Sequence, residues 1–123
     1  MIETVRVSEK AKLQLMTIKK RTKIKNWNIV CRWAFLLSLK DKSVPAPEDI
    51  PSDSNVEMTW KTFTGTYDKL FLSLLLKRLA KDNIAISKDN VSRYFKIHLH
   101  RGISFLSGTQ YKIINNYLSL IND

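Results

Sequence analysis

The stretch VRVSEKAKLQLMTIKKRTKIKNWNIVCRWA, residues 5–34, decides the fold of the N-terminal third of this chain. From Ile2 to Val7, apolar and polar side chains alternate imperfectly, which predicts a short strand. Ser8 can cap a helix whose first turn carries Glu9, and the apolar residues that follow recur at helical spacing. We therefore expect a helix over residues 9–21, a turn, and a second helix over residues 27–40.

This order of strand, helix, turn and helix is the layout of a ribbon-helix-helix protomer. A strand this short is not stable alone, so we expect it to pair with the same strand of a second chain across a two-fold axis. The alternative is pairing inside the chain, with residues 56–62. In ribbon-helix-helix regulators the strand enters the major groove, and its outward side chains here would be Thr4 and Arg6.

The remaining sequence predicts a mainly α-helical chain of 123 residues folded as one compact domain. Residues 1–40 form the ribbon-helix-helix-like element, and residues 41–55, with all three prolines, form an extended acidic surface loop. Residues 56–123 form the helical remainder, beginning with a strand over VEMTWKTF, residues 56–63. Three further helices are expected over 67–81, 88–106 and 110–121, with Thr66 and Ser87 as N-caps and Gly108 as a left-handed C-cap.

Positive charge dominates the chain, whose formal net charge is +10. Residues 1–42 hold eleven Lys and Arg against three Asp and Glu, so the N-terminal third is the most basic part. Such an excess indicates a polyanionic partner, most commonly nucleic acid, with an anionic membrane surface as the second candidate.

The turn KKRTKIK, residues 19–25, concentrates this charge. Lysine suits phosphate contact better than base reading, so we predict binding to the duplex backbone without sequence specificity. A merely solvated turn is the alternative. A left-handed Lys23, where glycine is common, would cost about 1 kcal/mol. The predicted DNA contacts are Arg6, Lys12, Lys19, Lys20, Arg21, Lys23 and Lys25.

The predicted helix over residues 27–40 is apolar nearly all round. Such a helix needs cover on every side, so we expect a homo-oligomer, a tetramer, with this helix at the interface. The single cysteine, Cys31, fits a reducing cytoplasm. We find no signal peptide and no apolar run long enough to span a membrane.

Neither a catalytic site nor a metal or cofactor site is indicated by the residues. His98 and His100 are two apart and cannot share one metal on a helix, so His100 and Arg101 are expected to serve packing. Glu57 and Lys61 would share one side of an extended strand, which leaves a metal-dependent nicking enzyme as the alternative. The other acids considered for such a site, better explained as solvated or as partners of Arg32 and Arg101, are Glu48, Asp53 and Asp68.

Three separated motifs resemble the DndE family, the small component of bacterial DNA phosphorothioation systems. They are IKNWN with CRWA in residues 24–34, IPSDSNVEMTWKTF in residues 50–63, and HLHRGI in residues 98–103. The resemblance implies a cytoplasmic, oligomeric DNA-binding accessory protein that favours nicked duplex. Its implied partners are a sulfur-transferring, nucleotide-dependent enzyme and an ATPase, and a nicking activity has been proposed for some members. A ribbon-helix-helix transcriptional repressor is the other alternative function.

Overall fold

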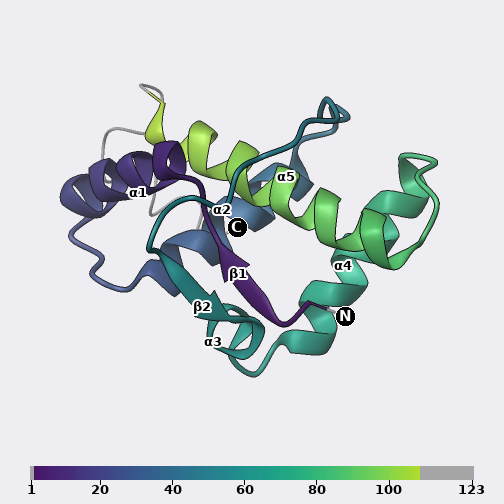
Figure 1. Cartoon of the computed structure of the whole chain (residues 1–123), viewed down its shortest axis with the longest axis horizontal. Helices are drawn as coiled ribbons and strands as arrows, with labels where there is room; N and C mark the ends of the chain where they lie inside the picture. The colour runs from purple at the N-terminus through teal and green to yellow at the C-terminus, as the bar shows by residue number, and fades with distance from the viewer. Residues whose placement is uncertain (1, 109–123) are drawn as a thin grey trace.

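Two short strands are interspersed among helices along residues 2–108, the part of the chain that this computed structural model describes. The predicted mainly α-helical class, with strand, helix and helix at the start, is confirmed. The helix expected over residues 110–121 lies outside the described residues. In order, the elements are β1 (Thr4–Arg6), α1 (Glu9–Thr22), α2 (Trp27–Lys40), β2 (Glu57–Thr59), α3 (Trp60–Thr64), α4 (Asp68–Lys81) and α5 (Lys88–Ser107) (Figure 1).

Helix α1 begins and ends as its sequence predicts. The Ser8 hydroxyl accepts a hydrogen bond from the Ala11 amide at 3.1 Å, and Glu9 lies in the first turn. At the other end Lys23 adopts the left-handed conformation, with φ of 64°, and its amide donates to the Lys19 carbonyl at 2.9 Å. The cost of placing lysine there is therefore present in this fold.

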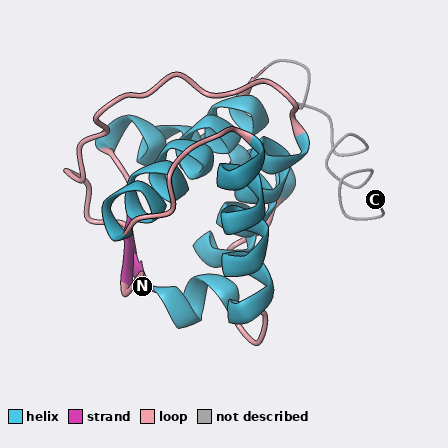
Figure 2. Cartoon of the chain, turned by 90° about the vertical axis from the view of Figure 1, so that its right-hand side faces the viewer, coloured by secondary structure: helices cyan, strands magenta, loops and turns pink. Residues whose placement is uncertain are grey.

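The two strands form an antiparallel pair within one chain, with Val5 opposite Met58 and Arg6 opposite Glu57. The expected pairing across a two-fold axis is therefore wrong, and the alternative of pairing inside the chain is correct. Beyond the strands the Val7 amide donates to the Val56 carbonyl at 3.2 Å. The reason is the proline-rich loop, which returns the chain beside β1 and satisfies its backbone groups locally. Figure 2 shows this small sheet at one edge of the helices.

The strand expected over residues 56–63 is shorter in the structure, and its second half is helix α3. The Thr59 hydroxyl accepts from the Thr62 amide at 3.0 Å and so starts a helix where alternation alone predicted a strand. Lys61 therefore does not share one face of a strand with Glu57, and that predicted pair is wrong.

The caps of the later helices agree only in part with expectation. Ser87 caps α5 as predicted, since its hydroxyl accepts from the Asn90 amide at 3.1 Å. Thr66 does not cap α4, because Tyr67 occupies that position without a side-chain bond. Gly108 is not left-handed: with φ of −70° and ψ of 165° the chain leaves α5 in an extended direction.

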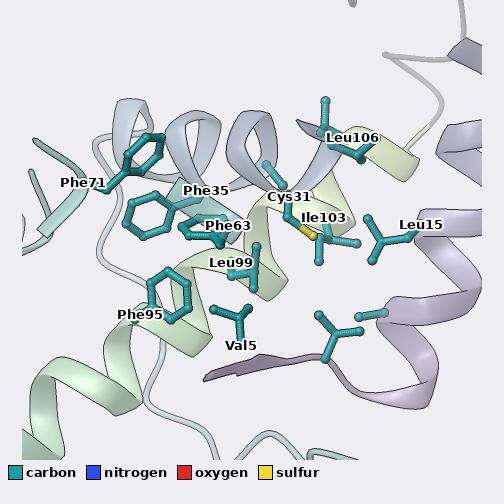
Figure 3. Close-up of a cluster of buried hydrophobic side chains, with 14 of the residues drawn as sticks. Val5, Leu15, Cys31, Phe35, Phe63, Phe71, Phe95, Leu99, Ile103 and Leu106 are labelled. Atoms are coloured by element: carbon teal, nitrogen blue, oxygen red, sulfur yellow. The ribbon is translucent and has the colours of Figure 1, made fainter. Parts of the chain in front are cut away.

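Helices α2 and α5 form the centre of the core and pack against each other more extensively than any other pair of elements described. Figure 1 shows α1 and α4 at opposite ends of the molecule, with α5 running between them. Phe35, Phe63 and Phe95 meet in the core with ring centroids 5.1–5.9 Å apart (Figure 3). This packing covers the face of α2 that carries Val30, Cys31, Ala34, Phe35 and Ser38.

The loop between α2 and β2 has no helix or strand, yet arginines hold its first residues. Arg78 is buried and donates to the carbonyls of Leu39, Asp41 and Ser43 at 2.6–2.9 Å. Arg101 donates to the carbonyls of Ser38 and Ser43 at 2.7 and 2.8 Å. These bonds satisfy carbonyls at the C-terminal end of α2.

Of the two explanations for the loop acids, pairing with Arg32 and Arg101 is wrong, because Arg32 donates to backbone carbonyls and Arg101 to carbonyls and hydroxyls of Ser38 and Ser43. Arg32 donates to the carbonyls of Thr62 and Phe63. Carbonyls at helix ends and turns need donors, and arginine supplies several in one plane. None of the helices described in residues 2–108 is long and apolar enough to cross a membrane.

Candidate nucleic-acid interface

Four lysines on α1 and on the connection that follows it form no ion pair with any of residues 2–108. We call them the lysine surface: Lys12, Lys20, Lys23 and Lys25. Lys12 lies on α1, Lys20 in its last turn, and the other two in the connection. The last three are exposed and Lys12 is half-buried, so their ammonium groups can reach a ligand in solution.

Lys19 joins the end of α1 to the start of α2. Its Nζ lies 3.7 Å from the centroid of the Trp27 ring, in a cation–π contact. The indole leaves the positive charge in place, because it offers no anionic group. Lys19 therefore adds to the potential beside the lysine surface while it holds the two helices together.

The two arginines among the predicted contacts are bound within the chain. Arg6 pairs with Glu57 at 2.7 Å across the two strands. Arg21 donates from Nη1 to the Ser107 carbonyl at 3.0 Å, near the C-terminal end of α5. Of the seven predicted contacts, both arginines thus serve as internal links, while the five lysines form no ion pair with an acid among residues 2–108.

A hollow of about 510 Å³ adjoins the lysine surface. Lys12 and Lys25 line it together with Asn26, Asn28 and Asn55, which come from the start of α2 and from the segment before β2. The asparagines were not predicted as site residues, because Asn26 and Asn28 have the sequence signature of helix caps. Asn26 precedes α2 but makes no side-chain cap bond, and this leaves its amide for other partners.

Comparison with protein families matches residues 4–113 to the family described as DNA sulphur modification protein DndE. This chain belongs to the DndE family. Among solved structures, it is similar to DndE from Escherichia coli B7A, described as involved in DNA phosphorothioation modification. The TM-score is 0.71 at 20% identity, over 86% of this chain and 98% of that one.

A second DndE crystal structure, of a lysine-substituted variant described as involved in DNA phosphorothioation, has a TM-score of 0.67 at 19% identity. It covers 86% of this chain and 97% of the variant. No curated protein sequence matches. At these identities the two structures establish a shared fold for this DndE-family chain.

Both histidines of this DndE-family chain make hydrogen bonds that hold α5 in place. His98 is buried, its Nδ1 lies 2.8 Å from the Ser38 Oγ, and burial lowers its pKa to about 4. His100 donates from Nδ1 to the Lys96 carbonyl at 2.7 Å and accepts from the Ser8 amide at 3.1 Å. Its pKa is lowered, mainly by burial. The packing role predicted for His100 is confirmed by these two bonds.

The acids considered for a nuclease site do not meet in one place: Glu48 and Asp53 line one hollow, whereas Glu57 and Asp68 are not among its lining residues. The carboxylate of Glu57 is held by Arg6, and Asp53 accepts from the Glu9 amide at 2.8 Å. Glu48 lies in the loop and Asp68 in the first turn of α4. Within residues 2–108, no three His, Cys, Asp or Glu side chains stand close enough together to hold a metal ion.

Proposed function

We propose that this chain is a non-catalytic accessory protein of DNA phosphorothioation that binds the backbone of duplex DNA, nicked duplex included. Membership of the DndE family supports a role in that system. The observation that carries the DNA proposal is the lysine surface, where Lys12, Lys20, Lys23 and Lys25 have no acidic partner among the described residues.

Unpaired lysines fit the phosphate backbone for a physical reason. Each ammonium group that neutralises a phosphate releases condensed counterions, and this gain does not depend on the base sequence. Base reading favours the forked groups of arginine, asparagine and glutamine. Arg6 and Arg21, the two arginines nearest in sequence, are bound to Glu57 and Ser107. The surface therefore favours binding that is independent of sequence.

A ribbon-helix-helix repressor is a weaker candidate, because such proteins read bases with a strand. In this chain β1 pairs with β2, and the exposed Arg6 on it is held by Glu57. Selection from a random duplex library tests the difference. We expect no enriched motif, whereas a single palindrome preferred by about a thousandfold would contradict the proposal.

Metal-dependent nicking is the second alternative. Glu57, which lines the hollow together with Lys12 and Lys25, is neutralised by Arg6 at 2.7 Å. Supercoiled plasmid incubated with the protein and Mg²⁺ or Mn²⁺ tests this function. We expect the plasmid to stay supercoiled, and nicking that disappears in the Glu57→Gln variant would establish an enzyme.

The protein is also proposed to act as a homo-oligomer, a tetramer, with part of α2 at the interface. The core covers one face of α2, while Leu36 on the other side is 39% exposed, beside half-buried Trp33 and Leu37. These residues follow helical spacing, so they form one apolar stripe. An oligomer would also place several lysine surfaces along one duplex and strengthen binding.

The remaining proposals concern partners and location. The family's role suggests docking to the sulfur-transferring enzyme and the ATPase of the same system. We propose a cytoplasmic location, because a protein that acts on chromosomal DNA must reach it there and the thiol of Cys31 would stay reduced. Co-purification from cells that express the modification proteins together tests the docking, and its absence under low salt would contradict it.

A further inference from the structure

We propose that the hollow beside the lysine surface binds a nucleoside monophosphate group, with adenine as the preferred base. This site deepens the proposed function and rests on it in part, because Lys12 and Lys25 belong to both surfaces. Backbone binding needs only exposed charge. A nucleotide site needs, in addition, a recess and groups that can hydrogen-bond to a base.

The recess has the dimensions and the position that this ligand requires. Its volume of about 510 Å³ lies within the range of small-molecule sites. Its walls come from α1, from the connection before α2, and from the segment around β2. These elements are fixed by the strand pair and by packing of α1 on the core, so the recess is formed without a ligand.

The charges on its walls favour a phosphate. Lys12 and Lys25 both line the hollow, and the only acid among its lining residues is Glu57, whose Oε2 is bound by Arg6 at 2.7 Å. A phosphate placed between the two lysines meets two positive charges and no free carboxylate. Lysine acts as a point charge toward phosphate, and two such groups suit a dianionic phosphomonoester.

The amides on its walls favour a base. Asn26 makes no side-chain bond to α2, and no described residue bonds to the side-chain amide of Asn55. Each therefore offers one donor and one acceptor, the pattern with which asparagine recognises N6 and N7 of adenine. Met58 and Val56 add apolar surface against which the sugar or base can pack.

A second hollow among the described residues serves as a comparison. It has about 490 Å³ and lies between α1, α5 and the proline-rich loop. Three carboxylates, those of Glu48, Asp49 and Asp53, are among its lining residues. Lys10 and Arg101 line it too, so its walls carry three carboxylates and two cations. The hollow beside the lysine surface has two lysines and the single carboxylate of Glu57, which Arg6 binds, and it therefore favours an anionic ligand more.

The experiment is a titration of the full chain with dAMP, followed by the backbone amide signals and the asparagine side-chain amide signals in ¹H–¹⁵N spectra; the backbone signals also report on variants that lack the asparagines. We expect saturable shifts at Asn26 and Asn55, with weaker binding of deoxyadenosine and of inorganic phosphate. The Asn26→Ala/Asn55→Ala variant should bind dAMP at least about tenfold more weakly. The matched control, Gln14→Ala in the other hollow, should bind like the unchanged protein.

The proposal is overturned if dAMP causes no saturable shift, if the double variant binds it as well as the unchanged protein, or if inorganic phosphate binds equally well. The double variant keeps every lysine, so its affinity for intact duplex reports on the backbone proposal separately. Comparison of nicked duplexes that carry a 5′-phosphate or a 5′-hydroxyl at the nick shows whether the ligand of the hollow is a DNA strand end or a free nucleotide. Loss of discrimination between them in the variant indicates a strand end, and unchanged discrimination indicates a free nucleotide.

Discussion

Gly102 of α5 lies directly against Ala34 of α2: a Cβ added to Gly102 would stand 1.6 Å from the Ala34 carbonyl oxygen. The two helices that carry the core therefore meet backbone to backbone at this crossing. The contact also shows that Ala34 faces α5 within the chain and is fully buried. A change at either residue acts first on folding.

Gly102→Ala should destabilise the fold strongly. The added methyl group meets backbone atoms that cannot rotate away, so α2 and α5 must separate, at a cost of about 3 kcal/mol or more. Urea unfolding followed by circular dichroism measures the change. The control is Ser104→Ala at an exposed position of the same helix, which should shift stability by less than about 0.5 kcal/mol. An unchanged midpoint for Gly102→Ala would refute this packing.

Lys23→Gly should stabilise the protein by up to about 1 kcal/mol, because glycine adopts the left-handed conformation without the penalty that lysine has. The same exchange at Lys20 removes the same charge inside α1 and should destabilise it by about 1 kcal/mol. Urea titrations of the two variants should therefore give changes in the free energy of unfolding that have opposite signs. Equal signs would mean that charge and not backbone conformation governs stability at this turn.

Stability should fall as the pH drops from about 6.5 to about 4. The pKa of His98 is lowered to about 4 by burial, and then by Arg101 and Arg78. The unfolded chain therefore binds a proton in this window that the folded chain does not, which favours unfolding. The full effect of His98 is roughly 3 kcal/mol, present above pH 6.5 and lost by about pH 4.

His98→Asn, which keeps a polar group toward Ser38, should flatten this dependence without abolishing it. His100 remains and its pKa is shifted in the same direction. Chemical denaturation at several pH values between 4 and 7 measures the slope. A slope identical to that of the unchanged protein would show that His98 is not the titrating group.

Leu36→Glu should dissociate the proposed oligomer while the monomer stays folded, because the side chain is exposed in the single chain and a buried charge at an interface is costly. Leu70→Glu, at a 53% exposed position of α4, is the matched control and should leave the assembly intact. Light scattering gives the mass. A glutamate at the buried position Ala34 of α2 would not test the interface, because Ala34 is in the core of the single chain and the change would unfold it. A monomer of the unchanged protein would contradict the oligomer itself.

Local signals along the chain predicted the helices well, and long-range contacts explain what they missed. Ser8 and Ser87 started helices because their caps involve residues only three positions away. The pairing of Val5 with Met58 depends on how a loop returns, which periodicity does not encode. Thr59 started a helix inside an alternating pattern, because its cap outweighed the alternation.

In the candidate site, too, local sequence predicted one part and long-range contacts determined the rest. The lysines were found from charge density, a property of the sequence itself. That Arg21 binds Ser107, 86 residues away, could not be read from the turn. The asparagines of the hollow were missed because their neighbours come from α1 and from the segment around β2.

The central claim, backbone binding through the lysine surface, is tested most directly by salt titration of duplex affinity. The measurement compares the unchanged protein with Lys20→Ala/Lys23→Ala and with Lys69→Ala/Lys77→Ala, which removes equal charge from exposed positions of α4. Intact and nicked duplex are both used. Four phosphate contacts give a slope of log affinity against log salt near −4, and each lost contact flattens it by about 0.9 per bound subunit. We predict a flatter slope for the first variant and an unchanged slope for the second; equal slopes in all three proteins would contradict the account.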